Sequence, residues 1–158
     1  MTTIKKKDMQ ETLDIVHDLN DLLTRNYDAE KGYLNAAEKV KHEGLKNYMM
    51  ARAQNRYDFG HELKKIISGL DGKIYKGTSF EGDVHRMWMS FKDSITSGDV
   101  AIYEECIRGE RYFIEKYEEM LKDDSLPESL RAMLSRQLNA ANKAIEDLQV
   151  MKEAIQAG

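Results

Sequence analysis

Apolar residues recur at intervals of three and four over most of the chain, and this spacing predicts long amphipathic helices. The first helix is expected from about Asp8 to Lys41, with Gly44 in the position of a C-terminal glycine cap. The residues of its expected buried line are Leu13, Val16, Leu19, Leu23, Tyr27, Leu34, Ala37 and Val40.

Further helical stretches follow the first one. The apolar spacing predicts helices over about 45–70, 80–95 and 99–122, and a last helix that begins at Pro127 and runs to about residue 156. Three glycines between residues 69 and 79 indicate a loop before the short helix. No stretch has the pattern of a convincing strand, so the predicted fold class is all-α.

Most connections between the expected helices are short, so consecutive helices should run antiparallel. The two long hairpins would then be joined by a segment that travels the length of the bundle, here the short helix over about 80–95. This connectivity predicts a ferritin-like antiparallel four-helix bundle with a short helical crossover, and a single domain over residues 1–158. Residues 96–99 form either a hairpin or a kink, and a kink would change the order of the helices.

Charged residues interrupt the expected core lines at one level of the bundle. Glu30 falls on the buried line of the first helix and Glu110 on that of the 99–122 helix, each about 20 Å from its end of the bundle. Arg52 and Arg56 of the second helix and Gln137 of the last helix face the same level. Because isolated buried carboxylates are costly, we expect them to pair with the guanidinium groups. The sequence therefore predicts a buried Glu/Arg network in the core.

Several motifs in the chain are specific in combination. They are LNDL at 19–22, YDAEKGY at 27–33, GDVHRMW at 82–88 and ECIRGE at 105–110, together with Arg52, Arg56, Phe59, Glu62 and Leu63. Over about residues 12–121 the chain thereby resembles a bacterial family of unknown function that is grouped with ferritin-like four-helix-bundle proteins. The resemblance implies the fold and a kinship with stress proteins, and it implies no established activity.

A metal site is the alternative interpretation of the core carboxylates. Glu30 and Glu110, with His85 as a third candidate ligand, could bind iron or zinc. A ferritin-like di-iron centre also needs a Glu-x-x-His motif on each of two helices. That motif is missing from the second and the last helix, where arginines stand instead. We therefore expect no metal or other cofactor, and we expect His85 to hydrogen-bond the network.

Composition excludes several classes of function. The formal net charge is −4 with acidic and basic residues interspersed, so the chain lacks the basic face of a nucleic-acid-binding protein. The single cysteine, Cys106, and the absence of a long apolar run suggest a cytoplasmic protein outside the membrane. No catalytic triad, phosphate loop or dinucleotide motif is present, which favours a non-catalytic structural or interaction role. A homodimer or another protein partner stays open.

Overall fold

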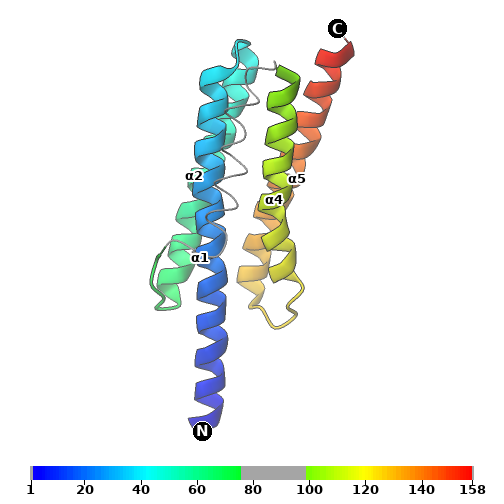
Figure 1. Cartoon of the computed structure of the whole chain (residues 1–158). Coiled ribbons are helices and arrows are strands. Elements are labelled where there is room, and N and C mark those ends of the chain that lie inside the picture. Colours follow the sequence, from blue (N-terminus) through cyan, green and yellow to red (C-terminus); the bar gives the residue numbers. More distant parts are fainter. Residues whose placement is uncertain (1, 76–98, 158) are drawn as a thin grey trace.

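The chain forms an antiparallel four-helix bundle. The computed structural model describes residues 2–75 and 99–157, and these contain helices and no strand. The helices, labelled as in Figure 1, are α1 (Thr2–Lys39), α2 (Glu43–Gly69), α4 (Asp99–Leu121) and α5 (Glu128–Ala157). The all-α fold class expected from the sequence is confirmed.

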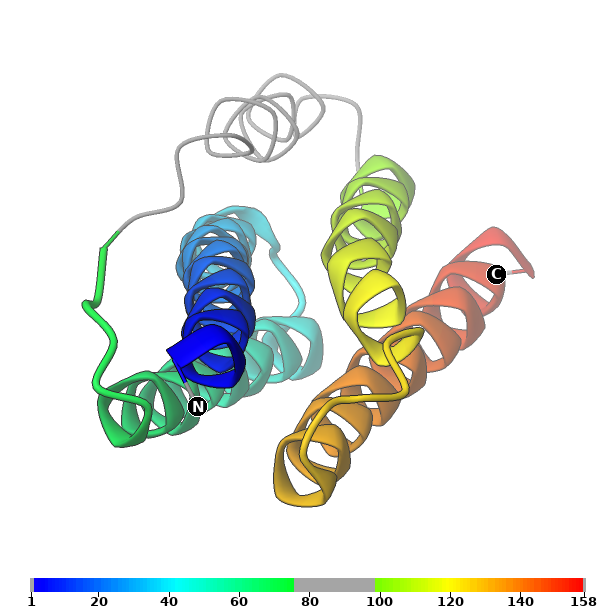
Figure 2. The ribbon, with the colours of Figure 1, turned by 90° about the horizontal axis from the view of Figure 1, so that it is seen from below.

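The four helices are arranged as two hairpins side by side. α1 packs along α2 and α4 packs along α5, while α1 and α4 provide the main contact between the hairpins. α2 and α5 touch only over a short stretch, and their ribbons lie apart in the view along the bundle (Figure 2). α2 and α4 consequently lie diagonally opposite each other across the core.

The connection between the hairpins runs between opposite ends of the bundle. α2 ends at the lower end in Figure 1 and α4 begins at the upper end, so the intervening chain has to join the two ends. The helical crossover predicted over about 80–95 lies outside the described residues, as does most of the predicted break at 96–99. The direction of α4 agrees with the order of helices expected from a long crossover.

The turn between α1 and α2 differs from the one predicted. α1 ends at Lys39 and α2 begins at Glu43, with His42 as the N-cap residue. The Nδ1 atom of the His42 ring accepts a hydrogen bond from the backbone N–H of Leu45 at 3.3 Å. Gly44 therefore lies in the first turn of α2, and the prediction that it caps the first helix was wrong.

The end of α2 has the geometry of a Schellman motif. The Gly72 N–H donates to the Ile67 carbonyl at 2.9 Å, and the Asp71 N–H donates to the Ser68 carbonyl at 3.0 Å. Asp71 takes the left-handed conformation that this motif requires, with φ of 57°. Gly72 then lies against Val16 of α1, where a Cβ atom would approach both Val16 methyl groups to 2.7 Å. The motif turns the chain back onto α1.

The core surrounds the middle of α1 more completely than an amphipathic helix requires. All of the residues from 19 to 26 are buried, although five of them are polar or charged. Further along α1 the buried line runs through Ala29, Tyr33 and Ala36. Leu34 is exposed, as is Leu13 near the start of the helix, so the predicted buried line was wrong at these two positions.

Within residues 2–75 and 99–157, no helix has both the length and the apolar content that would let it cross a membrane.

Candidate functional site

A fully buried ion pair joins α2 to α4 in the middle of the bundle. Nη2 of Arg56 lies 2.5 Å from Oε1 and 2.7 Å from Oε2 of Glu110. Neither side chain is accessible to solvent. Since α2 and α4 are diagonal neighbours, this charge-assisted contact crosses the centre of the core and connects the two hairpins.

Tyr33 brings α1 into the same cluster. Its hydroxyl donates a hydrogen bond to Oε1 of Glu110 at 2.5 Å. Burial and the neighbouring Glu110 carboxylate raise the pKa of Tyr33 well above its ordinary value, so the phenol keeps its proton. The Glu110 carboxylate thus receives hydrogen bonds from two other helices.

The face of the Arg56 guanidinium lies against aromatic rings. Its Cζ atom is 4.4 Å from the centroid of Phe113 and 5.6 Å from that of Phe59. Burial alone lowers the pKa of Arg56, but the Glu110 charge, the Tyr33 hydroxyl and the hydrogen bond to Glu110 outweigh it and raise the pKa. Nε and Nη1 of Arg56 have no hydrogen-bond partner within the described part of the chain.

A second polar cluster continues the first one toward α5. The Tyr117 hydroxyl donates to Oε1 of Gln137 at 2.6 Å, and Nδ2 of Asn26 donates to the Tyr117 oxygen at 3.1 Å. All three side chains are buried. Burial raises the pKa of Tyr117, so this phenol is a donor at any physiological pH. Taken together, the two clusters connect all four helices.

The remaining residues of the predicted network lie elsewhere. Glu30 is half-buried and, among residues 8–75 and 99–157, forms no ion pair with Arg52 or Arg56. Arg52 is also half-buried, and its Cζ lies 5.4 Å from the centre of the Tyr48 ring. His85 lies outside the described residues. The prediction that Glu30 lies on the buried line of α1 is therefore corrected. The residue of α1 that contacts Glu110 is Tyr33.

Cys106 is a buried thiol beside the cluster. Burial, with the charges of Glu110 and Glu105, raises its pKa well above the ordinary value. Its Sγ atom lies 3.9 Å from Sδ of Met49. A protonated and inaccessible thiol is a poor nucleophile and a poor metal ligand.

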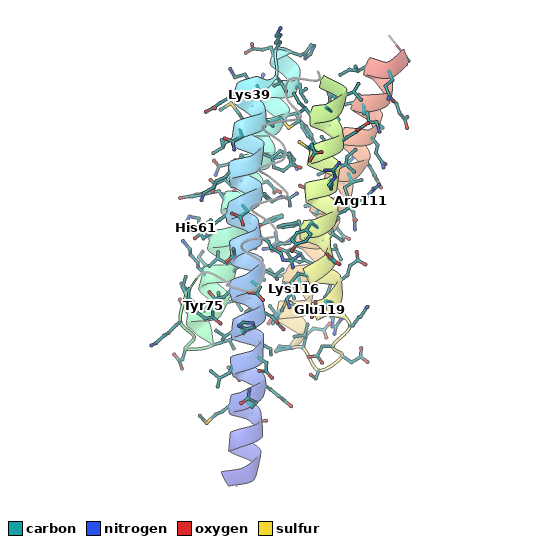
Figure 3. The ribbon with its side chains drawn as sticks, in the orientation of Figure 1. Lys39, His61, Tyr75, Arg111, Lys116 and Glu119 are labelled. Carbon is teal, nitrogen blue, oxygen red and sulfur yellow. The ribbon has the colours of Figure 1, made fainter. Side chains whose placement is uncertain are left out.

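Sequence reasoning missed a group of buried polar residues between α1 and α4. Arg25 donates from Nη1 to the Tyr112 carbonyl at 2.6 Å. Lys116, labelled in Figure 3 on the side of α4 toward α1, lies 2.9 Å from Asp18 and 3.4 Å from Glu119. The signal was present in the sequence, because Asn20, Asp21 and the 24–26 stretch together cover most of the helix circumference, so some of them have to face the core.

The hydrogen-bond donors around Glu110 are suited to neutralising the charge of its carboxylate and not to leaving it free to bind a metal ion. Arg56 and Tyr33 occupy both carboxylate oxygens, and a guanidinium repels a cation. Across the described ranges, no three or more His, Cys, Asp or Glu side chains are grouped so that they could hold a metal ion.

Comparison with known proteins identifies a matching family. The family described as "Domain of unknown function (DUF2383)" matches residues 14–123 of the chain. No curated protein matches the chain.

Proposed function

The chain belongs to the DUF2383 family, whose function is unknown, and from its own geometry we propose that it is a non-catalytic structural bundle. In this proposal the buried Glu/Arg pair stands where ferritin-like proteins hold a di-iron site. The protein's task is then to keep a rigid helical surface in a defined register, on which other proteins can bind.

The contact between Arg56 and Glu110 carries this proposal. A carboxylate that ligates a metal must offer a lone pair to it, whereas both Glu110 oxygens already lie within 2.7 Å of the same guanidinium nitrogen. The compensating positive charge is therefore supplied by the chain itself. Buried ion pairs of this kind contribute little net stability, and their best-supported role is to specify one arrangement of helices.

The contact between Arg56 and Glu110 can specify the register of α2 relative to α4. Sliding or rotating α2 relative to α4 would leave a guanidinium and a carboxylate buried without each other, at a cost of several kcal/mol. Apolar side chains at the same positions would tolerate such shifts much better. The pair thus excludes alternative packings of the two hairpins.

A double-mutant cycle tests the role of the pair. We expect Glu110→Ala to lower the free energy of unfolding by about 3–5 kcal/mol, since it leaves a buried charge without a partner. Glu110→Ala combined with Arg56→Leu should lose less than Glu110→Ala alone. The control is Glu62→Ala, which removes the exposed partner of Arg136 and should cost at most about 1 kcal/mol. Simple additivity of the two core changes would contradict the proposal.

Metal analysis tests the alternative of an iron or zinc site. The purified protein, exposed to iron, manganese or zinc and then desalted, should contain no stoichiometric metal by mass spectrometry. Stoichiometric metal that disappears in Glu30→Ala and in Glu110→Ala would overturn the structural role. The double-mutant cycle measures unfolding free energies and does not depend on the metal analysis. Each experiment can therefore be interpreted without the other.

A further inference from the structure

A half-exposed histidine lies between a buried carboxylate and a tyrosine hydroxyl at the place where the chain leaves α2. Nδ1 of His17 is 3.0 Å from the hydroxyl of Tyr75, which is labelled in Figure 3, and Nε2 of the same ring is 3.6 Å from Oδ2 of Asp21. The side chain of His17 is 49% exposed, while that of Asp21 is 1% exposed. Solvent therefore reaches the imidazole, which joins the buried Asp21 to the segment that follows α2, residues 73–75.

The charged groups around this pair leave Asp21 without a hydrogen bond. Both of its carboxylate oxygens lack a donor among the described residues. Nζ of Lys116 on α4 lies 2.9 Å from Oδ1 of Asp18 instead, and Arg25 of α1 donates to a backbone carbonyl of α4. Asp18 and the exposed Asp14 are two further acidic side chains of α1. The acidic side chains named here therefore outnumber the cationic ones.

The other described elements add little charge at this point. The end of α2 packs here through Gly72, which lies against Val16 of α1. Lys73 is an exposed residue of the segment 73–75. An imidazole ordinarily takes up its proton near pH 6.5. A change of pH across this value therefore alters the charge of the cluster through His17.

The contact with Tyr75 decides how His17 takes up a proton. Burial, with the charges of Asp21 and Asp18, raises the pKa of Tyr75, so the hydroxyl keeps its proton. In neutral His17, Nδ1 accepts a hydrogen bond from this hydroxyl, and Nε2 carries the hydrogen that faces Asp21. A proton added at Nδ1 makes the ring a cation, and Nδ1–H then donates to the Tyr75 oxygen. Hydrogen bonds from a charged donor are stronger, and the added charge also attracts the Asp21 carboxylate.

We propose that His17, Asp21 and Tyr75 form an acid-strengthened clasp, in which protonation of His17 holds residues 73–75 more tightly on α1. While the segment is in place, Tyr75 orients the ring so that Nε2 faces Asp21. Release of the segment frees the ring and weakens its attraction to the carboxylate, so the attached segment favours the protonated ring. The clasp lies away from the Arg56–Glu110 pair and does not depend on the proposed function.

The clasp has an upper and a lower pH limit. Well above about pH 6.5 the imidazole is neutral, and the charge of the buried Asp21 is left uncompensated. As the pH falls through this value, the imidazolium compensates the carboxylate and the clasp tightens. Burial raises the pKa of Asp21 above 3.8, although His17 and Lys116 act in the opposite direction, so in stronger acid the carboxylate becomes protonated and the ion pair is lost. The segment is therefore held most tightly at about pH 5–6.

Hydrogen exchange of backbone amides tests the clasp. The Tyr75 N–H donates to Oδ1 of Asn20, so its exchange reports whether residues 73–75 are in place. After correction for the intrinsic pH dependence of exchange, its protection should be about two- to fivefold higher at about pH 5.5 than at about pH 7.5, which is the effect of a half-exposed ion pair. The amide of Leu134 on α5 should change less. An equal rise at both amides would mean that acid stabilises the whole bundle, and it would overturn the clasp.

Three substitutions test whether the histidine and its carboxylate are the cause. His17→Gln and Asp21→Asn should each abolish the rise in protection of the Tyr75 amide, because one of the two charges is missing. His61→Gln is the matched control, since His61 is an exposed histidine of α2, and it should keep the rise. The protection of Leu134 in each variant shows that the bundle is folded. A rise that persists in His17→Gln or in Asp21→Asn, or its absence from the wild type, would contradict the proposal.

Discussion

The side chain of Asn20 on α1 holds the backbone of Tyr75, the last residue described after α2. The Tyr75 N–H donates to Oδ1 of Asn20 at 2.8 Å, while Nδ2 of Asn20 donates to the Lys73 carbonyl at 2.9 Å. The same Nδ2 donates to the Val16 carbonyl at 3.0 Å, and Nδ1 of His17 lies 3.0 Å from the Tyr75 hydroxyl. The buried side-chain amide of Asn20 thus attaches the segment that follows α2, residues 73–75, to the surface of α1.

Replacing Asn20 should release this attachment. We expect Asn20→Ala to lower the free energy of unfolding by about 1–3 kcal/mol, because the amide is buried and its backbone partners lose their hydrogen bonds. The Tyr75 amide should also exchange its hydrogen faster than in the wild type. Asn139→Ala on the exposed side of α5 is the control and should change stability by less than about 0.5 kcal/mol. Unchanged protection of the Tyr75 amide would refute the attachment.

The close approach of Gly72 to Val16 makes a second prediction. Gly72→Ala should destabilise the protein by about 1–3 kcal/mol, since the new Cβ would lie 2.7 Å from both Val16 methyl groups. Gly69→Ala, three residues earlier, meets no atom within 4 Å and should be neutral or stabilising. Thermal unfolding of the two variants, with Val16→Ala added to the first, would show whether the methyl contact is the cause. Equal effects of the two glycine changes would argue against it.

Asp21 makes a prediction about pH. Both of its carboxylate oxygens lack a hydrogen-bond donor among the described residues, and Nε2 of His17 lies 3.6 Å from Oδ2. Burial raises its pKa above the ordinary 3.8, although His17, Lys116 and Arg25 act in the opposite direction. The folded protein therefore binds this proton more tightly than the unfolded chain, and ionisation of Asp21 destabilises the fold as the pH rises.

Removing that charge should stabilise the protein near neutral pH. Asp21→Asn should raise the free energy of unfolding near pH 7, and the gain should shrink as the pH falls toward about 4, where Asp21 becomes protonated. Asp14→Asn at an exposed position of the same helix is the control, and near pH 7 it should change the free energy of unfolding by less than about 0.5 kcal/mol. If Asp21→Asn instead destabilises the fold more at neutral pH than in acid, the carboxylate is stabilising and the direction of the pKa shift is wrong.

The Tyr117 hydroxyl offers a test of the second polar cluster. Tyr117→Phe should cost about 1–3 kcal/mol, because Oε1 of the buried Gln137 loses its donor and Nδ2 of Asn26 keeps only its hydrogen bond to the Leu22 carbonyl. Adding Gln137→Leu to this variant should recover part of the loss. Tyr57→Phe on the exposed face of α2 serves as the control. Denaturant unfolding provides the comparison, and a double variant that is less stable than Tyr117→Phe would count against the hydrogen bond.

The long helices could be predicted from sequence because their apolar spacing repeats over many turns. The rotation of α1 about its own axis could not. Between residues 27 and 37, two neighbouring faces of the helix are both apolar, one through Tyr27 and Leu34 and the other through Tyr33 and Ala36. A difference of 100° per residue separates them, and only the packing of the other helices decides which face is buried.

The partner of Glu110 was predictable, while the complete cluster was not. A carboxylate on a core line needs a positive charge, and Arg56 is one of the few candidates on α2. Tyr33 gave no comparable signal, since a tyrosine suits both core and surface. Similarly, the His42 cap that displaced Gly44 depends on a side-chain conformation that apolar spacing does not encode.

The diagonal position of the Arg56–Glu110 pair has a consequence for folding during synthesis. The two residues are 54 positions apart in sequence, one in each hairpin. During synthesis the first hairpin leaves the ribosome with a guanidinium on its inner face and no carboxylate to match it. Its interior can therefore close only after α4 has been translated, which ties the maturation of the N-terminal half to the arrival of the C-terminal half.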